Sequence, residues 1–195
     1  MQASLFPELR SDLPRGLLLS NPIVSPSDQA VLAERIDASG LTPFRFQQWT
    51  GKRLTRSYGW HYDFEGRGLT SAEAMPDWLL GVRKMACSAL GEPAERYEQA
   101  LLIRYDPGAG IGWHRDRPQF STVIGVSLGS QVDLRLRRRT GDGFDRATVP
   151  LSAGAAYLLS GEARSEWEHS IVPVTRLRHS ITFRALTGDA AIAGR

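Results

Sequence analysis

A histidine and an aspartate two positions apart are the residues of this sequence best suited to chemistry. His114 and Asp116 follow a glycine-rich turn at residues 106–112, and on an extended backbone two such side chains project from one face. A second histidine would complete a two-histidine, one-carboxylate metal site, which leaves positions on Fe(II) open for a co-substrate and oxygen. His169, in a later predicted strand, is the candidate. Taken alone, the His114 and Asp116 pair also fits a solvent-exposed turn without a metal.

Two arginines near the end of the sequence could bind an anion beside such a metal. Arg178 and Arg184 are an even number of positions apart in a predicted strand, so both side chains project from the same face. Two guanidinium groups in a core strand are costly unless anions meet them. A dicarboxylate with one end on the metal would supply these anions, and so would Asp or Glu side chains of the protein itself.

The elements that must position these residues divide into helices and then strands. Capping residues and apolar spacing predict one helix from Ser25 to Gly40 and another from Pro76 to Gly91. From about Glu98 onward, short β-type runs alternate with turn residues. These predicted strands are residues 100–105, 122–128, 132–136, 147–151, 155–159, 169–174 and 179–186. Short strands without a helix long enough for a parallel crossover favour an antiparallel sandwich or barrel.

Together, these features carry a family resemblance. Residues 101–116, LLIRYDPGAGIGWHRD, resemble the metal-binding segment of AlkB-type 2-oxoglutarate/Fe(II) dioxygenases. Later landmarks of that family have counterparts in the same order at residues 126–129, 161–164 and 178–184. The resemblance implies a mainly β fold with N-terminal helices (α+β), built on a double-stranded β-helix, or jelly-roll, core.

The same resemblance implies how the chain is organised. We expect a single dioxygenase domain over residues 1–195. Residues 1–96 would form the N-terminal helices and a substrate lid, and residues 97–186 the jelly-roll catalytic core.

Site roles follow from the resemblance position by position. The two histidines and the aspartate named above would hold Fe(II), with 2-oxoglutarate and dioxygen as co-substrates. Arg178 would pair with the distal carboxylate of 2-oxoglutarate, helped by the hydroxyls of Tyr105 and Ser180. Arg184 would lie near the carboxylate that chelates the metal. Ile103 replaces an asparagine that is frequent in the family, which removes one hydrogen bond to the co-substrate.

The implied reaction is oxidative. 2-Oxoglutarate is converted to succinate and carbon dioxide while a nearby C–H bond is hydroxylated; on an N-methyl group, hydroxylation is followed by loss of formaldehyde. We therefore predict demethylation of alkylated bases in DNA or RNA, single-stranded or flipped from a duplex. The alternatives are a hydroxylase or demethylase of tRNA or protein, or a jelly-roll module that binds without catalysis. Zn²⁺ could occupy the same ligands but has no redox chemistry.

Basic and aromatic residues interleave at residues 52–64, KRLTRSYGWHYDF, where the chain resembles the family's substrate lid. This mixture binds phosphates and stacks an unpaired base. The stacking candidates are Tyr58, Trp60 and Tyr62, and the phosphate-binding candidates are Arg53 and Arg56. A hairpin that buries its aromatic residues is the alternative.

Other charged residues have less specific interpretations. A second phosphate-binding stripe could be formed by Arg135, Arg137, Arg138 and Arg139, although a solvated strand explains them as well. His61 could touch the substrate, and His179 projects from the face opposite Arg178 as a packing residue. Pro118 stands where base-repair members often carry an acidic residue that contacts the damaged base, which leaves the preferred base open.

Composition limits the class of protein. The 195 residues include 24 basic and 21 acidic side chains, and the net charge of +3 is compatible with a nucleic-acid partner without establishing one. The single cysteine, Cys87, excludes a disulfide framework and a cysteine-built metal site. No apolar run approaches the roughly 20 residues that cross a bilayer, and no secretory signal pattern is present. We expect a cytoplasmic monomer with no membrane partner.

Overall fold

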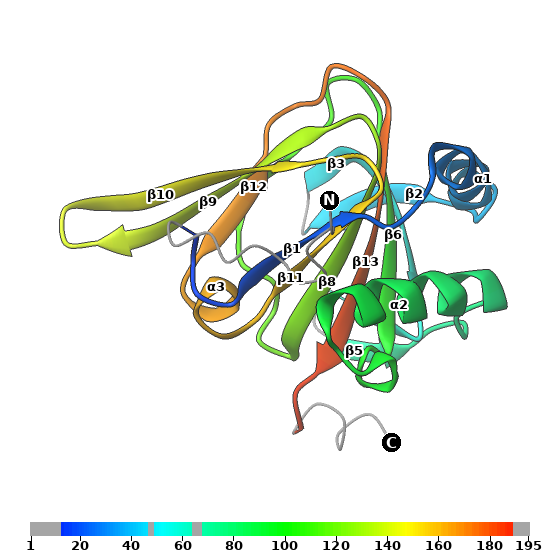
Figure 1. The fold of residues 1–195 in the computed structure, drawn as a ribbon, viewed down its shortest axis with the longest axis horizontal. Helices are drawn as coiled ribbons and strands as arrows, with labels where there is room; N and C mark the ends of the chain where they lie inside the picture. The colour runs from blue at the N-terminus through cyan, green and yellow to red at the C-terminus, as the bar shows by residue number, and fades with distance from the viewer. Residues whose placement is uncertain (1–12, 47–48, 64–67, 189–195) are drawn as a thin grey trace, which may run out of the picture.

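Two antiparallel sheets face each other across a shared apolar core (Figure 1). The computed structural model describes residues 13–46, 49–63 and 68–188. The larger sheet has seven strands in the spatial order β1-β11-β8-β13-β6-β3-β2. Their bounds are β1 Leu17–Pro22, β2 Thr42–Phe46, β3 Trp49–Tyr58, β6 Gln99–Tyr105, β8 Phe120–Gly129, β11 Ala155–Leu159 and β13 Arg178–Leu186.

The smaller sheet has four strands in the order β10-β9-β12-β7. Their bounds are β7 Ile111–His114, β9 Val132–Thr140, β10 Gly143–Leu151 and β12 Glu168–Ile171. Between the sheets, Leu134, Leu136 and Val149 of the smaller sheet pack with Val123 and Tyr157 of the larger one. A separate hairpin joins β4, Trp60–Asp63, to β5, Gly68–Ser71. These facing sheets confirm the predicted mainly β jelly-roll core.

Helices cover the outer face of the larger sheet. They are α1 Pro26–Asp37, α2 Asp77–Leu90 and the 3₁₀ turn η1 Ala94–Arg96, whereas the short α3 Gly161–Ser165 lies elsewhere and buries Ala163 in the core between the sheets. The apolar stripe of α2, including Leu79, Val82 and Leu90, is buried in one cluster with Ile181 and Phe183 of β13. Each such side chain contributes roughly 1.5–3 kcal/mol by leaving water. None of the helices in the described ranges is long and apolar enough to cross a membrane.

Strand alternation along β13 separates core packing from chemistry. Ile181 and Phe183 face the helices, so the alternate residues face the smaller sheet. Those inward residues are Arg178, Ser180, Thr182 and Arg184, and all four line one cavity. The predicted placement of both arginines on one face is therefore confirmed.

An ionic cluster ties α1 to the outer face of the larger sheet. His179 Nε2 lies 2.8 Å from Asp37 Oδ1, and Arg104 Nη1 donates to Asp37 Oδ2 at 2.8 Å. Burial alone would raise the pKa of Asp37, but its hydrogen bonds to His179 and Arg104 outweigh burial and lower it. His179 is thus a packing residue on the face opposite Arg178, as the sequence predicted.

All seven predicted strands and both predicted helices are present, with different ends. The first helix ends at Asp37 rather than Gly40. β12 ends at Ile171, because the following residues leave the sheet and Val174 exchanges backbone hydrogen bonds with Gly108 and Ala109. The sequence did not predict β1, β2, β3, β4, β5 and β7. Three of these, β1, β2 and β3, precede residue 97 yet are strands of the larger sheet.

Candidate metal and co-substrate site

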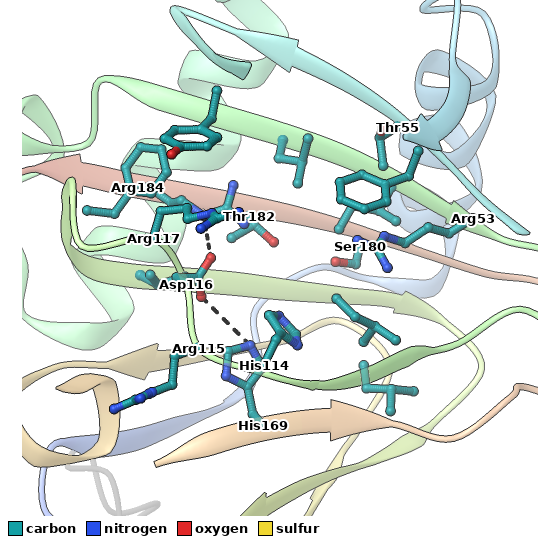
Figure 2. A pocket seen from close by; sticks show the side chains of 18 of the residues that line it. Arg53, Thr55, His114, Arg115, Asp116, Arg117, His169, Ser180, Thr182 and Arg184 are labelled. Carbon is teal, nitrogen blue, oxygen red and sulfur yellow. Dashed lines mark hydrogen bonds and ion pairs between the residues drawn. The ribbon is translucent and has the colours of Figure 1, made fainter. Parts of the chain in front are cut away.

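A cavity of about 690 Å³ lies between the two sheets and collects most of the residues predicted to do chemistry. Figure 2 shows Ser180, Thr182 and Arg184 along β13 on one side, and His114 and His169 on the other. Apolar side chains such as Ile103 and Leu134 form part of the wall. The cavity therefore surrounds its charged groups with a poorly solvated environment, in which electrostatic interactions are strong.

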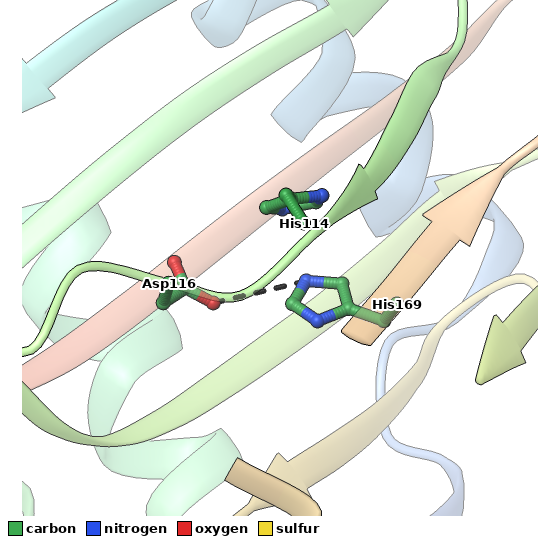
Figure 3. A group of neighbouring side chains, drawn as sticks. All are labelled: His114, Asp116 and His169. Atoms are coloured by element: carbon green, nitrogen blue, oxygen red, sulfur yellow. Dashed lines mark ion pairs between the residues drawn. The ribbon is translucent and has the colours of Figure 1, made fainter. Parts of the chain in front are cut away.

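Three potential metal ligands converge at one end of this cavity (Figure 3). His114 ends β7 and pairs across the sheet with His169 of β12, while Asp116 follows just beyond the strand end. Their ligand atoms all lie within 4.8 Å of one another. His114 Nδ1 donates to the carbonyl of Gly112 at 2.9 Å, which leaves Nε2 as the ligand atom. The predicted grouping of these three residues is present in the structure.

Arg184 orients the carboxylate of the group. Its Nε donates to Asp116 Oδ1 at 2.8 Å, and its Nη1 donates to Gln99 Oε1 at 3.0 Å. Burial alone would raise the pKa of Asp116, but the charges of Arg184, His169 and His114 outweigh burial and hold that pKa well below its usual range. Asp116 is therefore ionised, as a metal ligand must be. Arg184 has the protein carboxylate partner that the sequence had left open.

Both histidines are held in the neutral form that binds metals. Burial, followed by the neighbouring His114, lowers the pKa of His169 to about 3. Burial also lowers the pKa of His114, although the Asp116 charge opposes this effect. Two neutral imidazoles and one carboxylate with space beside them form the ligand set of non-haem Fe(II) oxygenases, so these residues fit Fe(II).

Acidification is expected to destabilise the metal-free protein. The unfolded chain binds a proton at His169 below about pH 6.5, whereas the folded chain does not until about pH 3. The free energy of unfolding therefore falls as the pH decreases through this window, by about 2 kcal/mol from His169 at about pH 5. Urea unfolding at several pH values measures the slope. His169→Gln should make it shallower and the exposed His61→Gln should not; equal slopes in all three proteins would contradict the argument.

Arg178 is the group best suited to bind the co-substrate. It is 1% exposed, its Nη2 donates to Ser127 Oγ at 3.3 Å, and its guanidinium lies 5.0 Å from the centre of the Tyr105 ring. Within the described ranges, Nε and Nη1 have no hydrogen-bond acceptor. A buried cation with two unmatched donors calls for a carboxylate. Tyr105 and Ser180 line the same cavity, so this part of the site fits the distal end of 2-oxoglutarate.

Strand alternation divides the predicted lid residues between two environments. On β3, Arg53 lines the cavity with Thr55 and Ser57. Arg53 is 8% exposed and stacks 3.8 Å from the centre of the Phe44 ring, and Figure 2 shows it pointing toward the Ser180 end. Its Nε has no acceptor among the described residues. Arg53 therefore points into the cavity rather than toward the protein surface.

Of two other lid predictions, the one for Tyr58 is wrong and the one for Arg56 stays a prediction. Tyr58 is 6% exposed and belongs to the cluster between the larger sheet and the helices, so it cannot stack on a bound base. Arg56 also projects away from the cavity, and its Nη2 pairs with Glu73 Oε2 at 2.6 Å. The error at Tyr58 has one cause: residues 52–64 were treated as a single lid, whereas a strand sends alternate residues to opposite faces.

The remaining lid aromatics differ from each other. Trp60 begins β4 and does not belong to the described cavity wall, whereas Tyr62 does. The Arg117 guanidinium lies 5.1 Å from the centre of the Tyr62 ring. His61 also lines the cavity. Of the three stacking candidates, the structure brings only Tyr62 to the site.

Several cavity residues were not predicted from the sequence. They include Gln99, Trp113, Arg115, Arg117 and Thr182. Alternation along β13 would have found Thr182, because it lies between Ser180 and Arg184 on the inward face. Gln99, a buried polar residue beside Arg184, had no comparable signal.

Comparison with known proteins agrees with this geometry. A model of the 2OG-Fe(II) oxygenase superfamily matches residues 11–184. The chain is 26% identical over 172 residues to a tRNA (carboxymethyluridine(34)-5-O)-methyltransferase alkbh8 of Xenopus tropicalis, which covers 85% of this chain and 26% of that protein. It is 24% identical over 182 residues to the ALKBH8 of the same description from Macaca fascicularis, covering 88% and 26%. The chain thus spans about a quarter of the length of these relatives.

Solved structures share the fold. OsALKBH1 superposes with a TM-score of 0.68 at 17% identity, over 89% of this chain and 98% of that one. A Pseudomonas putida prolyl-4-hydroxylase superposes with a TM-score of 0.55 at 21% identity, over 89% and 94%. With the family match spanning nearly the whole described core and the His114, Asp116 and His169 ligands in place, the chain belongs to the 2OG-Fe(II) oxygenase superfamily, and its site residues fit Fe(II) and 2-oxoglutarate.

Proposed function

We propose that this enzyme removes methyl groups oxidatively from alkylated nucleic-acid bases in DNA or RNA, releasing succinate, carbon dioxide and formaldehyde. The observation that carries the proposal is the cavity, which has room for more than the co-substrate and combines the ligand triad with a cationic and aromatic wall. On that wall, Arg117 stacks on Tyr62 and Arg53 stacks on Phe44. Aromatic and guanidinium planes of this kind stack unpaired bases.

Each group would have a separate task during the reaction. His114, Asp116 and His169 would hold Fe(II), which when bound supplies the oxidation of a C–H bond by dioxygen and 2-oxoglutarate. Arg178 would anchor the distal carboxylate of the co-substrate. Tyr62 would orient the base, and the apolar wall would exclude other oxidisable groups and water.

The relatives favour a second candidate within the same chemistry. Both curated relatives are described as acting on carboxymethyluridine in tRNA, so oxidation of a tRNA base without loss of a methyl group is the alternative. Arg115 and Arg117 flank Asp116 in the cavity wall, and Pro118 replaces an acidic contact. The proposal therefore names no single methylated base.

A panel of methylated oligonucleotides and tRNA, scored by mass spectrometry, tests the proposal. Demethylation predicts loss of the methyl group with equal amounts of formaldehyde and succinate, and Asp116→Asn should remove all three signals. A gain of one oxygen without formaldehyde would support the tRNA alternative. Tight binding of a methylated oligonucleotide with no turnover by the iron-loaded enzyme would contradict both and indicate a binding module.

A further inference from the structure

The outer face of the smaller sheet carries a row of arginines that has no part in the cavity chemistry. Along β9, Leu134 and Leu136 point into the core between the sheets. Alternation therefore places Arg135, Arg137 and Arg139 on the opposite face. Figure 1 shows the β9 and β10 hairpin extending outward past β12, so these side chains follow a projecting arm of the molecule.

The neighbouring strand adds to the same face. Phe144 of β10 pairs with Arg139, and Arg146 pairs with Arg137. We call Arg135, Arg137, Arg139, Phe144 and Arg146 the arginine face.

Few acids balance the arginine face. Glu168 of β12 accepts from Arg137 Nε at 2.6 Å, and Asp133 lies on this face at the far end of β9. Arg135 Nε donates to the neutral hydroxyl of Ser170, with Oγ at 3.2 Å. In the part of the chain that the structure describes, Arg135, Arg139 and Arg146 form no ion pair. The face therefore has an excess of positive charge.

Arg138, the next residue along β9, shows the contrasting arrangement. It projects from the other face of the hairpin, where its guanidinium pairs with Glu162, Glu166 and Asp145 at 2.6, 3.3 and 3.0 Å. The hairpin thus neutralises the arginine on its inner face and leaves Arg135, Arg139 and Arg146 on its outer face without carboxylate partners among the described residues.

Aromatic rings hold these guanidinium groups in place. Arg137, Arg139 and Arg146 lie 4.6, 5.8 and 5.5 Å from the centre of the Phe144 ring. Stacking uses the flat face of a guanidinium and leaves its N–H edge free for phosphate oxygens. Ordering the side chains in advance also lowers the entropy cost of binding.

The arginine face is continuous with the rim of the cavity. Trp113 of β7 lines the cavity, and its ring centre lies 4.9 Å from the Arg135 guanidinium and 4.5 Å from that of Arg137. A nucleic-acid strand that places one base in the cavity could therefore continue across Trp113 onto β9 and β10.

We propose that the arginine face binds the phosphate backbone of the nucleic acid whose base is presented to the cavity. This inference rests on the proposed function and adds the surface that binds the nucleic-acid strand outside the cavity. Charge favours a polyanion, and the interleaved aromatic rings favour a nucleic acid over an acidic protein or an anionic membrane.

Binding of unmethylated, fluorescently labelled oligothymidine and oligouridine to the full chain at several salt concentrations tests the face independently of catalysis. The triple variant Arg135→Gln, Arg139→Gln, Arg146→Gln removes the three arginines without carboxylate partners. Each phosphate contact contributes about 0.7 to the slope of log affinity against log salt for single strands, so that slope should decrease by about 2. Near 0.1 M salt, this corresponds to roughly 100-fold weaker binding.

A matched control removes the same charge from the opposite side of the molecule. The control is the triple variant Arg35→Gln, Lys84→Gln, Arg96→Gln, whose positions lie on α1, α2 and η1. It should keep the wild-type slope of log affinity against log salt. If both triple variants lose the same amount of affinity for the oligonucleotides, net charge alone explains the loss and the proposal is overturned. If the arginine-face variant binds the oligonucleotides as tightly as the wild type, the proposal is also overturned, but the proposed function is not.

Two further measurements keep the proposal testable. If the arginine-face variant unfolds, phenylglyoxal modification of the wild-type protein replaces it: bound oligothymidine should protect Arg139 and Arg146 but not Arg96, and no protection would overturn the proposal. Binding to phosphatidylserine vesicles without binding to either oligonucleotide would contradict both the surface and the proposed function.

Discussion

Asp116→Asn is expected to reduce succinate release by more than about 100-fold. The Asp116 carboxylate is the one anionic ligand of the triad. Even mutation of residues that only hydrogen-bond to metal ligands lowers metal affinity by about 10–100-fold. Asparagine keeps the shape of the side chain, and its amide oxygen can still accept from Arg184 Nε, which donates to Asp116 in the native protein. The variant should therefore stay folded but bind Fe(II) weakly. Anaerobic equilibrium dialysis with Fe(II) and a succinate assay measure the two effects.

Asp106→Asn provides a control with the same change of charge and shape. Asp106 accepts from Arg104 at 2.8 Å and is not among the described residues that line the cavity. Its substitution should leave Fe(II) binding and succinate release near wild-type values. Normal iron content and turnover in Asp116→Asn would remove Asp116 from the metal site.

Arg178→Met should raise the KM for 2-oxoglutarate by about 100-fold. Removing one partner of a buried charged pair costs about 2–5 kcal/mol, which corresponds to factors of about 30 to 4,000. The same substitution should not lower stability in the absence of co-substrate, because the native guanidinium is buried with unmatched Nε and Nη1 donors. Each buried unmatched donor costs about 1–3 kcal/mol. Thermal unfolding with and without 2-oxoglutarate should show that the variant loses only the stabilisation by ligand.

Arg178→Lys separates charge from geometry at this position. Lysine keeps the positive charge but offers a point charge in place of the planar fork, so its KM should fall between those of the wild type and Arg178→Met. An unchanged KM in Arg178→Met would exclude Arg178 from co-substrate binding. A marked loss of stability without ligand would mean that the guanidinium is already satisfied within the protein.

Local sequence pattern was sufficient for much of the fold and part of the site. The alternation of β13 determines that Arg178, Ser180 and Arg184 share one face and that His179 lies on the other, because successive side chains of a strand project from opposite faces. The strands after residue 98 were predictable for a similar reason: their turn residues and β-type runs are local signals.

The placement of residues 52–64 was predicted wrongly in part, because no local signal in the sequence determines it. The basic and aromatic composition of residues 52–64 suggested one binding surface, but β3 pairs with β6 and sends Arg53 into the cavity and Tyr58 into the core beneath the helices. The sequence shows which residues of β3 share a face. It does not show which of the two faces lines the cavity. That choice depends on which neighbours the strand acquires.

The sequence by itself determined the chemical types of the site: two histidines and an aspartate for a metal, and arginines on one strand face for an anion. Tertiary structure alone decided how they meet. Pairing of β12 with β7 brings His169 against His114, and the facing of the two sheets brings Arg184 to Asp116 while leaving Arg178 unmatched. These contacts join residues far apart in the chain. They follow from sheet pairing and core packing, which no short stretch of sequence encodes.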